Sequence, residues 1–357
     1  MRSIRTMIKV LNGWIATRTN TLLLTGVLSG FSILSVTAQT AGTVQPLGEG
    51  LTAKKFYSST IGDNNSVWFL TESGIVSYDG VKWTLHNKNS NIAATGLKSL
   101  QYDGSELLVA TSKGATVASL PVEAGSAVAT YFPDNSKILS ENVLAIAAGK
   151  KDLKWFGTDK GISAIRSKKW LINDYANNYP DALFKDYTIT SMVTSLDGDS
   201  LYVGTIGGGV LRVFRNNVDA VSGASEYAAW GPILMPSDTV YSVHVAADGT
   251  QWIGTKQGVA KHIGFKTLEG WTIFTTADGL ADNLVQAIGS DSKGKLYFGT
   301  KNGLSVFDGT KWTTYNTENG LASNNILTIA IDKTDGVWIG TDNGVTSIKN
   351  GKLTSYR

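Results

Sequence analysis

The sequence predicts an all-β protein, a seven-bladed β-propeller whose blades are four-stranded antiparallel sheets. A strand–turn–strand motif, clearest at Gly336–Val345, occurs seven times. A threonine marks every copy: Thr71, Thr111, Thr158, Thr205, Thr255, Thr300 and Thr341. The copies are therefore 40 to 50 residues apart, and no run with helical periodicity separates them. Repetition at this period is typical of repeat architectures, and a β-sandwich does not predict seven copies of one motif.

The last repeat shows the expected order of strands. Residues 325–332 alternate apolar and small side chains, as an inner strand buried on both faces would. A turn at 333–336 leads to a second strand at 337–341, which is rich in β-branched and aromatic residues. A turn at 342–344 and a third strand at 345–348 follow, and Asn350-Gly351 predicts a hairpin into a fourth strand at 352–356.

Tryptophans and glycines recur at fixed places in the repeats. Trp68, Trp155, Trp252 and Trp338 share one position in the second strand, and Trp83, Trp170, Trp230, Trp271 and Trp312 fall at the start of the fourth. Gly157, Gly204, Gly254, Gly299 and Gly340 precede the motif threonine. A residue repeated in every blade is expected to fill the space between sheets, so we interpret these positions as packing rather than as platforms for sugars.

The first 38 residues lie outside the repeats and resemble a secretory signal peptide. Four basic residues precede an apolar run at 22–36, and the small residues at 36–38 predict cleavage between Ala38 and Gln39. A membrane anchor is the alternative, but the run is shorter than the roughly 20 apolar residues of a spanning helix. Residues 39–357 then form one propeller domain, in which 39–54 is a lead-in. The ring closes either by packing alone or with an edge strand from residues 40–50.

Composition excludes several classes of function. Without the leader's four basic residues, 28 Lys and Arg face 29 Asp and Glu, a net charge of −1. A nucleic-acid partner is not expected, because binding phosphate needs a basic surplus. The chain has no cysteine, so neither a disulfide framework nor a cysteine-anchored lipid is expected.

The linkers between repeats carry a family resemblance. Asn319-Gly320-Leu321-Ala322-Ser323-Asn324-Asn325-Ile326, and the corresponding stretch from Asp278 to Ile288, resemble the linker of the two-component-regulator propeller repeat. In that family, propellers usually form the periplasmic sensor half of hybrid histidine kinases, commonly from Bacteroidota, and respond to glycan fragments. This sequence ends one strand after its last motif, so the resemblance implies binding or assembly here, without a signalling output in the same chain.

Residues for chemistry are sparse. His86, His244 and His262 lack metal-ligand spacing, and His244 is expected either to face the channel or to have a structural role. The acidic turns at 197–199 and 332–335 lack the ligand set of a calcium loop, and no helix follows Gly207-Gly208-Gly209 to complete a phosphate site. We therefore expect no metal, no cofactor and no catalytic residue.

Departures from the repeat consensus are the better guide to a binding site. The connection at 175–186 is longer than its counterparts and carries Tyr175, Tyr179 and Phe184, the first candidates for ligand contact. Polar linker residues are expected on the same face, where fourth-to-first-strand connections and second-to-third-strand turns emerge. They are Asn142, Asp238, Asp282, Asn283, Asn324 and Asn325, with turn formation as the alternative. Residues 216–226 are interpreted as a surface insertion on the opposite face.

The sequence as a whole predicts a periplasmic or extracellular binding module without enzymatic activity, which recognises a glycan fragment or a peptide. The first alternative is a scaffold or accessory subunit with an envelope protein partner. The second is an enzyme such as a polysaccharide lyase. A concave mouth with polar and aromatic groups would favour a small ligand, and a large apolar patch would favour a protein partner.

Overall fold

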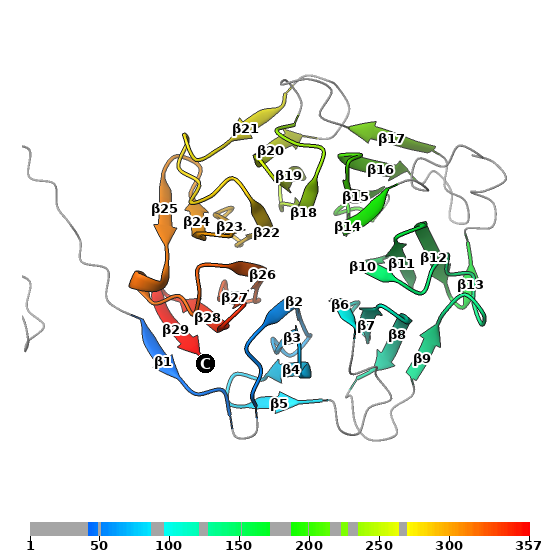
Figure 1. Ribbon diagram of the computed structural model, residues 1–357, viewed down its shortest axis with the longest axis horizontal. Helices are drawn as coiled ribbons and strands as arrows, with labels where there is room; N and C mark the ends of the chain where they lie inside the picture. Colours follow the sequence, from blue (N-terminus) through cyan, green and yellow to red (C-terminus); the bar gives the residue numbers. More distant parts are fainter. Residues whose placement is uncertain are drawn as a thin grey trace, which may run out of the picture. The chain divides into compact units, whose positions relative to one another are not determined.

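In the computed structural model, the described part of the chain forms a ring of seven sheets around a central channel (Figure 1). The structure describes residues 42–48, 51–86, 96–120, 128–150, 152–171, 187–198, 200–214, 223–227, 235–263 and 270–357. Thr40–Arg357 is one compact unit. The predicted seven-bladed propeller is thereby confirmed. The predicted leader, residues 1–38, lies outside the described residues.

Each blade is an antiparallel meander that runs outward from the channel. The inner strands are β2 (Phe56–Ile61), β6 (Leu97–Tyr102), β10 (Val143–Gly149), β14 (Thr188–Thr194), β18 (Val240–Val245), β22 (Val285–Ser290) and β26 (Ile326–Ile331). The second strands are β3 (Val67–Thr71), β7 (Glu106–Thr111), β11 (Leu153–Thr158), β15 (Ser200–Ile206), β19 (Thr250–Thr255), β23 (Leu296–Thr300) and β27 (Val337–Thr341).

The outer half of each blade is more variable in length. The third strands are β4 (Gly74–Tyr78), β8 (Gly114–Ser119), β12 (Gly161–Arg166), β16 (Val210–Phe214), β20 (Gly258–Ile263), β24 (Gly303–Phe307) and β28 (Gly344–Lys349). The fourth are β5 (Trp83–Leu85), β9 (Val128–Tyr131), β13 (Lys169–Trp170), β17 (Gly223–Tyr227), β21 (Thr272–Phe274), β25 (Trp312–Tyr315) and β29 (Lys352–Tyr356). A short 3₁₀ helix, η2 (Thr317–Asn319), precedes the last blade.

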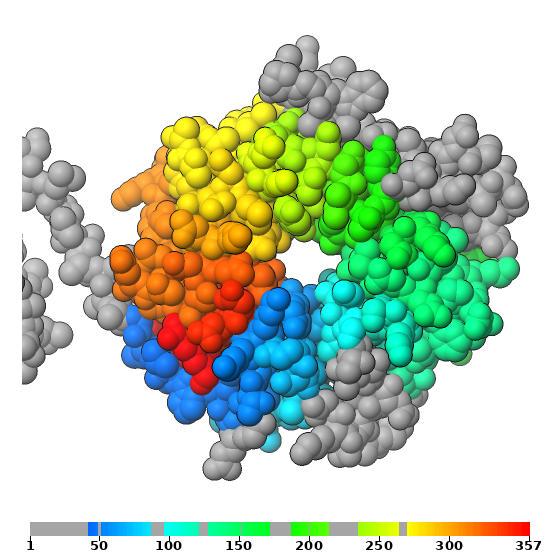
Figure 2. All heavy atoms as spheres, viewed as in Figure 1, coloured from blue at the N-terminus to red at the C-terminus, as the bar shows by residue number. Residues whose placement is uncertain are grey.

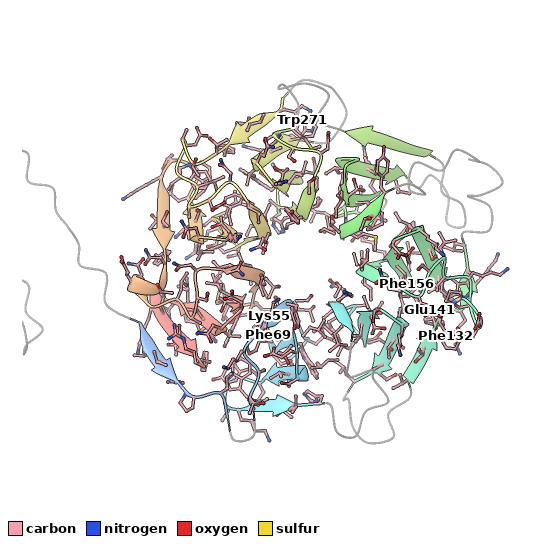
Figure 3. The ribbon with its side chains drawn as sticks, viewed as in Figure 1. Lys55, Phe69, Phe132, Glu141, Phe156 and Trp271 are labelled. Atoms are coloured by element: carbon pink, nitrogen blue, oxygen red, sulfur yellow. The ribbon has the colours of Figure 1, made fainter. Side chains whose placement is uncertain are left out.

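The core is divided among the contacts between blades. Seven clusters of buried apolar side chains each draw residues from two neighbouring blades. In blades 1 and 3, Phe69 and Phe156 occupy such interfaces, whereas Trp271 lies at the outer rim (Figure 3). The motif tryptophans Trp68, Trp155, Trp252 and Trp338 are 1 to 7% exposed. Because each sheet covers its neighbours on both sides, closure of the ring buries all of these faces.

The ring closes with a strand from the N-terminal side. β1 (Thr43–Gln45) lies beside β29 and pairs with it in parallel, so the last blade has five strands. Two backbone hydrogen bonds extend this pairing, from Arg357 N to Gln45 O (3.1 Å) and from Leu47 N to Arg357 O (3.2 Å). Of the two closure mechanisms that the sequence left open, the edge strand from residues 40–50 is the one observed.

Two local expectations were wrong. Residues 223–226, interpreted as part of a surface insertion, form the fourth strand β17 together with Tyr227, which pairs with Val210. A fourth strand has only one ladder to complete, so small and polar residues suffice for it. The last inner strand, β26, is also not buried on both faces, since Leu327 and Ile329 are half-buried and line the central cavity.

Gly320 is a sensitive point of this closure. Its φ is +105°, and a Cβ at this position would lie 2.7 Å from both the Cα and the N of Gly42, next to β1. We expect Gly320→Ala to lower the free energy of unfolding by about 2 kcal/mol or more, through backbone strain and displacement of β1. Gly351→Ala is the matched control, because Gly351 has φ +75° and a Cβ added there would have no atom within 4 Å. Urea unfolding measures both, and equal losses would contradict a role of the Gly42 contact.

His244 is expected to make stability depend on pH. Its Nε2 lies 2.8 Å from Ser290 Oγ on the neighbouring inner strand, and burial lowers the pKa of His244 to about 4. Between about pH 6.5 and pH 4 the unfolded chain binds this proton and the folded chain does not. The stability contributed by neutral His244 is thus complete above pH 6.5 and is lost as the pH falls. Between pH 7 and pH 5, the free energy of unfolding of His244→Gln should fall by on the order of 1 to 2 kcal/mol less than that of the unmodified protein. Parallel pH profiles for the two proteins would contradict this.

Candidate functional site

A cavity of about 310 Å³ lies on the axis of the ring, and residues from all seven inner strands line it. The space-filling view shows it as an opening between the blades (Figure 2). A site at this place is assembled from parts of the chain more than 250 residues apart, such as Ser59 and Thr328, whose hydroxyl oxygens lie 2.7 Å from each other. The cavity therefore exists only when the ring is closed.

Every inner strand carries a β-bulge at the same place. In blade 1, Phe56 pairs with Thr71 and Ser58 pairs with Leu70, so Tyr57 has no opposite residue. The same shift occurs in the other six blades. The extra residues, here called the bulge ring, are Tyr57, Lys98, Leu144, Thr190, Tyr241, Gln286 and Leu327, and all of them line the cavity. A bulge re-aims a side chain out of the regular pleat and is common beside functional sites.

The bulge ring lies toward one mouth of the channel. Each bulge directly follows the inner-strand residue that pairs with the motif threonine, as Phe56 pairs with Thr71. That threonine ends the second strand, where the chain turns into the third. The ring therefore lies at the end where these turns and the connections between blades emerge, which is the face on which the sequence placed its candidate residues.

Tyr57 and Lys98 occupy the bulge positions of the neighbouring blades 1 and 2. Lys98 is exposed, and among the described residues it has no ion pair. Burial, and then the charge of Glu72, raise the pKa of Tyr57 above its ordinary value, so its phenol keeps its proton at neutral pH. The ammonium of Lys55 lies 5.1 Å from the centroid of the Tyr57 ring. Figure 3 shows Lys55 next to the start of β2.

Gln286 and Thr190 are held by hydrogen bonds to the next blade. Gln286 Nε2 donates to Asn325 Oδ1 and to Ile326 O, both at 2.9 Å. Its carbonyl oxygen has no hydrogen-bond partner in the described part of the chain. Thr190 Oγ1 donates to Val240 O at 2.7 Å. These contacts fix the orientation of two polar side chains at the channel before any ligand arrives.

The linker residues predicted from sequence mostly stabilise the turns. Asn142 Nδ2 donates to Asp159 Oδ2 (3.1 Å), and Asn325 Nδ2 donates to Asp342 Oδ2 (2.9 Å), the same link in blades 3 and 7. Two asparagines accept from the backbone before the linker: Asn283 Oδ1 from Thr276 N, and Asn324 Oδ1 from Thr317 N. Asp282 Oδ1 accepts a hydrogen bond from Leu284 N. The carbonyl oxygen of Asp238 accepts hydrogen bonds from Gly207 N and Gly209 N. Asn325 also contacts the bulge ring, through Gln286. Tyr175, Tyr179 and Phe184 lie outside the described residues.

Sequence reasoning missed the bulge ring by two positions. Leu144 and Leu327 follow Asn142 and Asn325 by two residues. The signal was present, because the bulge residue differs in chemical type from blade to blade, whereas the residue before it is always apolar and the residue after it is always small. A strand pattern alone does not show a bulge, since the extra residue interrupts the alternation that identifies the strand.

One acidic cluster has the spacing of metal ligands but is filled by a lysine. Asp103, Glu106 and Asp152 bring carboxylate oxygens within 4.8 Å of one another. Lys154 Nζ lies 3.1 Å from Asp103 and 3.0 Å from Glu106, and it also contacts Asp152. These hydrogen bonds and charges raise the pKa of Lys154 despite its burial, so the ammonium persists. The cluster therefore joins blades 2 and 3.

Comparison with known proteins supports the repeat and the fold. A family model described as "Two component regulator propeller" matches residues 320–343, which confirms the predicted resemblance for that repeat. An extracellular domain assigned to the hybrid two component system BT4673 of B. thetaiotaomicron has a TM-score of 0.64 and 21% identity, over 86% of this chain and 39% of that one. The corresponding domain of BT3049 has a TM-score of 0.64 and 19% identity, over 87% and 41%. The chain thus spans about two fifths of these domains.

An enzyme has a similar fold. A catalytically inactive variant of virginiamycin B lyase from Staphylococcus aureus, solved with quinupristin, has a TM-score of 0.63 and 15% identity, over 85% of this chain and 97% of that one. Identities at this level establish the fold alone. No curated protein sequence is significantly similar. The chain is thus a seven-bladed propeller that carries, at residues 320–343, the two component regulator propeller repeat.

Proposed function

We propose that this protein is an exported, non-enzymatic binding module that holds a small glycan fragment in its central cavity, at the bulge ring. The observation that carries the proposal is the bulge itself, which directs one side chain of each blade into a cavity shared by all seven. Two tyrosines, an amide and a hydroxyl are among these side chains. In pockets for small molecules, a few polar groups placed in this way fix the orientation of the ligand.

The size of the cavity favours a small ligand over a peptide. Its volume of about 310 Å³ is at the lower end of the range of ligand pockets, roughly 300 to 1,000 Å³. An extended peptide also needs a free sheet edge or a long groove. Each inner strand is the channel-side edge of its sheet, but all seven edges surround one cavity of about 310 Å³, which is not a long groove for an extended peptide. A fragment of one or two sugar units, with its rings against Tyr57 or Tyr241, suits this space.

The residues of the lining favour binding over catalysis. Among the described residues that line the cavity there is no carboxylate and no histidine. Glycoside hydrolysis uses a pair of carboxyl groups, and a lyase needs a base that accepts a proton near neutral pH. Tyr57 is a poor candidate for that base, because its pKa is raised. The fold similarity to virginiamycin B lyase carries no residue across at 15% identity.

Export and a sensor-like role rest on the leader and on the structural neighbours. The neighbours BT4673 and BT3049 are extracellular domains, and residues 1–38 have the composition of a cleaved signal peptide. We assign 39–357 to the exported propeller. In the described part of the chain, no helix is apolar and long enough to span a bilayer. Tyr175, Tyr179 and Phe184 belong to the connection before β14, and we assign them a contact with the ligand outside the channel.

A scaffold role has less support. The exposed large apolar side chains of the described residues are Val44, Val81, Leu139, Leu196, Ile206 and Ile263. They are spread over blades 1, 4, 5 and 7 and the connection between blades 2 and 3, and over both faces of the ring, so they form no continuous patch. Single exposed apolar residues are normal on a soluble surface.

A thermal-shift screen of the mature protein against short oligosaccharides tests the proposal. A specific saccharide should raise the melting temperature in proportion to the logarithm of its concentration. Tyr57→Ala and Tyr241→Ala should each weaken its binding about tenfold, which corresponds to one lost stacking contact.

Tyr179→Ala and Phe184→Ala provide the comparison, since these residues belong to the connection at 175–186 and not to the bulge ring. A loss confined to these two variants would move the site from the bulge ring to the connection at 175–186. The proposal should be abandoned if no saccharide raises the melting temperature while an envelope extract yields a stoichiometric protein partner.

A further inference from the structure

The side chains of the bulge ring differ in charge and polarity, and the polar ones lie in neighbouring blades. Lys98, in blade 2, is the only ionised side chain among the described residues that line the cavity. Tyr57 stands beside it in blade 1. Thr190, Tyr241 and Gln286 form a continuous polar arc in blades 4 to 6, and the leucines of blades 3 and 7 separate the two sides. In a ring of seven, blade 2 faces blades 5 and 6 across the channel (Figure 1). A positive charge therefore opposes a phenol and an amide.

No carboxylate of the described lining neutralises this charge from within the cavity. The charge of Glu72 acts on Tyr57, but both carboxylate oxygens of Glu72 accept backbone hydrogen bonds: Oε1 from Lys54 N (2.6 Å) and Oε2 from Lys55 N (2.8 Å). Lys55 adds a second ammonium at the same side of the mouth. A cation that no carboxylate of the lining neutralises raises the concentration of anions at the cavity.

We propose that the bulge ring selects a small hydroxylated carboxylic acid, with the carboxylate at Lys98 and hydroxyl groups at Tyr241 and Gln286. This rests on the proposed function and names the class of its ligand: a sugar acid rather than a neutral sugar. The free carbonyl oxygen of Gln286 accepts a hydroxyl proton, because both contacts of its Nε2 hold the amide in place. The leucines and the ring of Tyr57 contact the C–H faces of the sugar.

Matched pairs of sugars test this selection. D-glucuronate and D-glucose, and D-galacturonate and D-galactose, differ only by a carboxylate in place of a hydroxymethyl group. Isothermal titration at low salt should give at least about tenfold tighter binding for the acid of one pair, as expected for a charge-assisted hydrogen bond. The preference should shrink as salt is added. Lys98→Gln should abolish it, and Lys98→Arg should preserve it.

Lys293→Gln is the control, because Lys293 is exposed in the turn between the inner and the second strand of its blade, at the end of the channel opposite to the bulge ring. It should leave the acid preference unchanged. Equal affinity for the acid and the neutral sugar, or a preference that survives Lys98→Gln, would overturn the inference but leave saccharide binding intact. If neither these sugars nor any oligosaccharide binds, both the inference and the proposed function are wrong.

Discussion

The motif threonine at the turn from the second to the third strand of each blade is the constraint on which the rest of the ring depends. In the last blade, Thr341 Oγ1 donates to Gly344 O (2.8 Å) and accepts from Asn343 N (3.1 Å), so one hydroxyl closes the turn. All seven copies make this pair of bonds, and all are 0 to 1% exposed. An unsatisfied buried hydroxyl is costly, so the turn and the threonine specify each other. Because the inner strand pairs with this threonine just before its bulge, the turn also determines where the bulge ring lies.

The glycine before the threonine sets how closely the blades approach. A Cβ on Gly340 would lie 2.5 Å from Thr328 Cγ2 and 2.9 Å from Phe56 Cβ, the first inner-strand residue of blade 1. Gly157, Gly204, Gly254 and Gly299 would each meet the corresponding residue of the following blade at 2.5 to 2.9 Å. Blades 1 and 2 have Leu70 and Ala110 instead, both fully buried. The packing thus tolerates a side chain at two of the interfaces, which explains why these two repeats are the hardest to recognise in the sequence.

The sequence predicted what repeats and missed what varies. Strand order, turn positions and the burial of Trp338 follow from period, propensity and hydrogen-bond chemistry, which act locally and in every copy. The bulge ring is set by register between two strands, and the alternation of residues in one strand does not report register. β17 was missed for a related reason, since an outer strand is held by backbone bonds to β16 and needs no apolar pattern. The parallel pairing of β1 with β29 joins the two ends of the chain, so sequence could only pose it as one of two options.

The geometry of the cavity depends on how the ring closes. Leu327 and Tyr57 belong to blades 7 and 1, which meet at the seam that β1 and β29 close. Ser59 follows Tyr57 by two residues and Thr328 follows Leu327 by one, and their hydroxyls bond across that seam. A cluster that includes Phe56, Trp338 and Tyr356 fills the seam. The spacing of two ring members is therefore determined by contacts that the covalent chain does not enforce. A ligand that touches both sides of the seam binds only the closed ring, and by mass action it stabilises closure with each increase in its concentration.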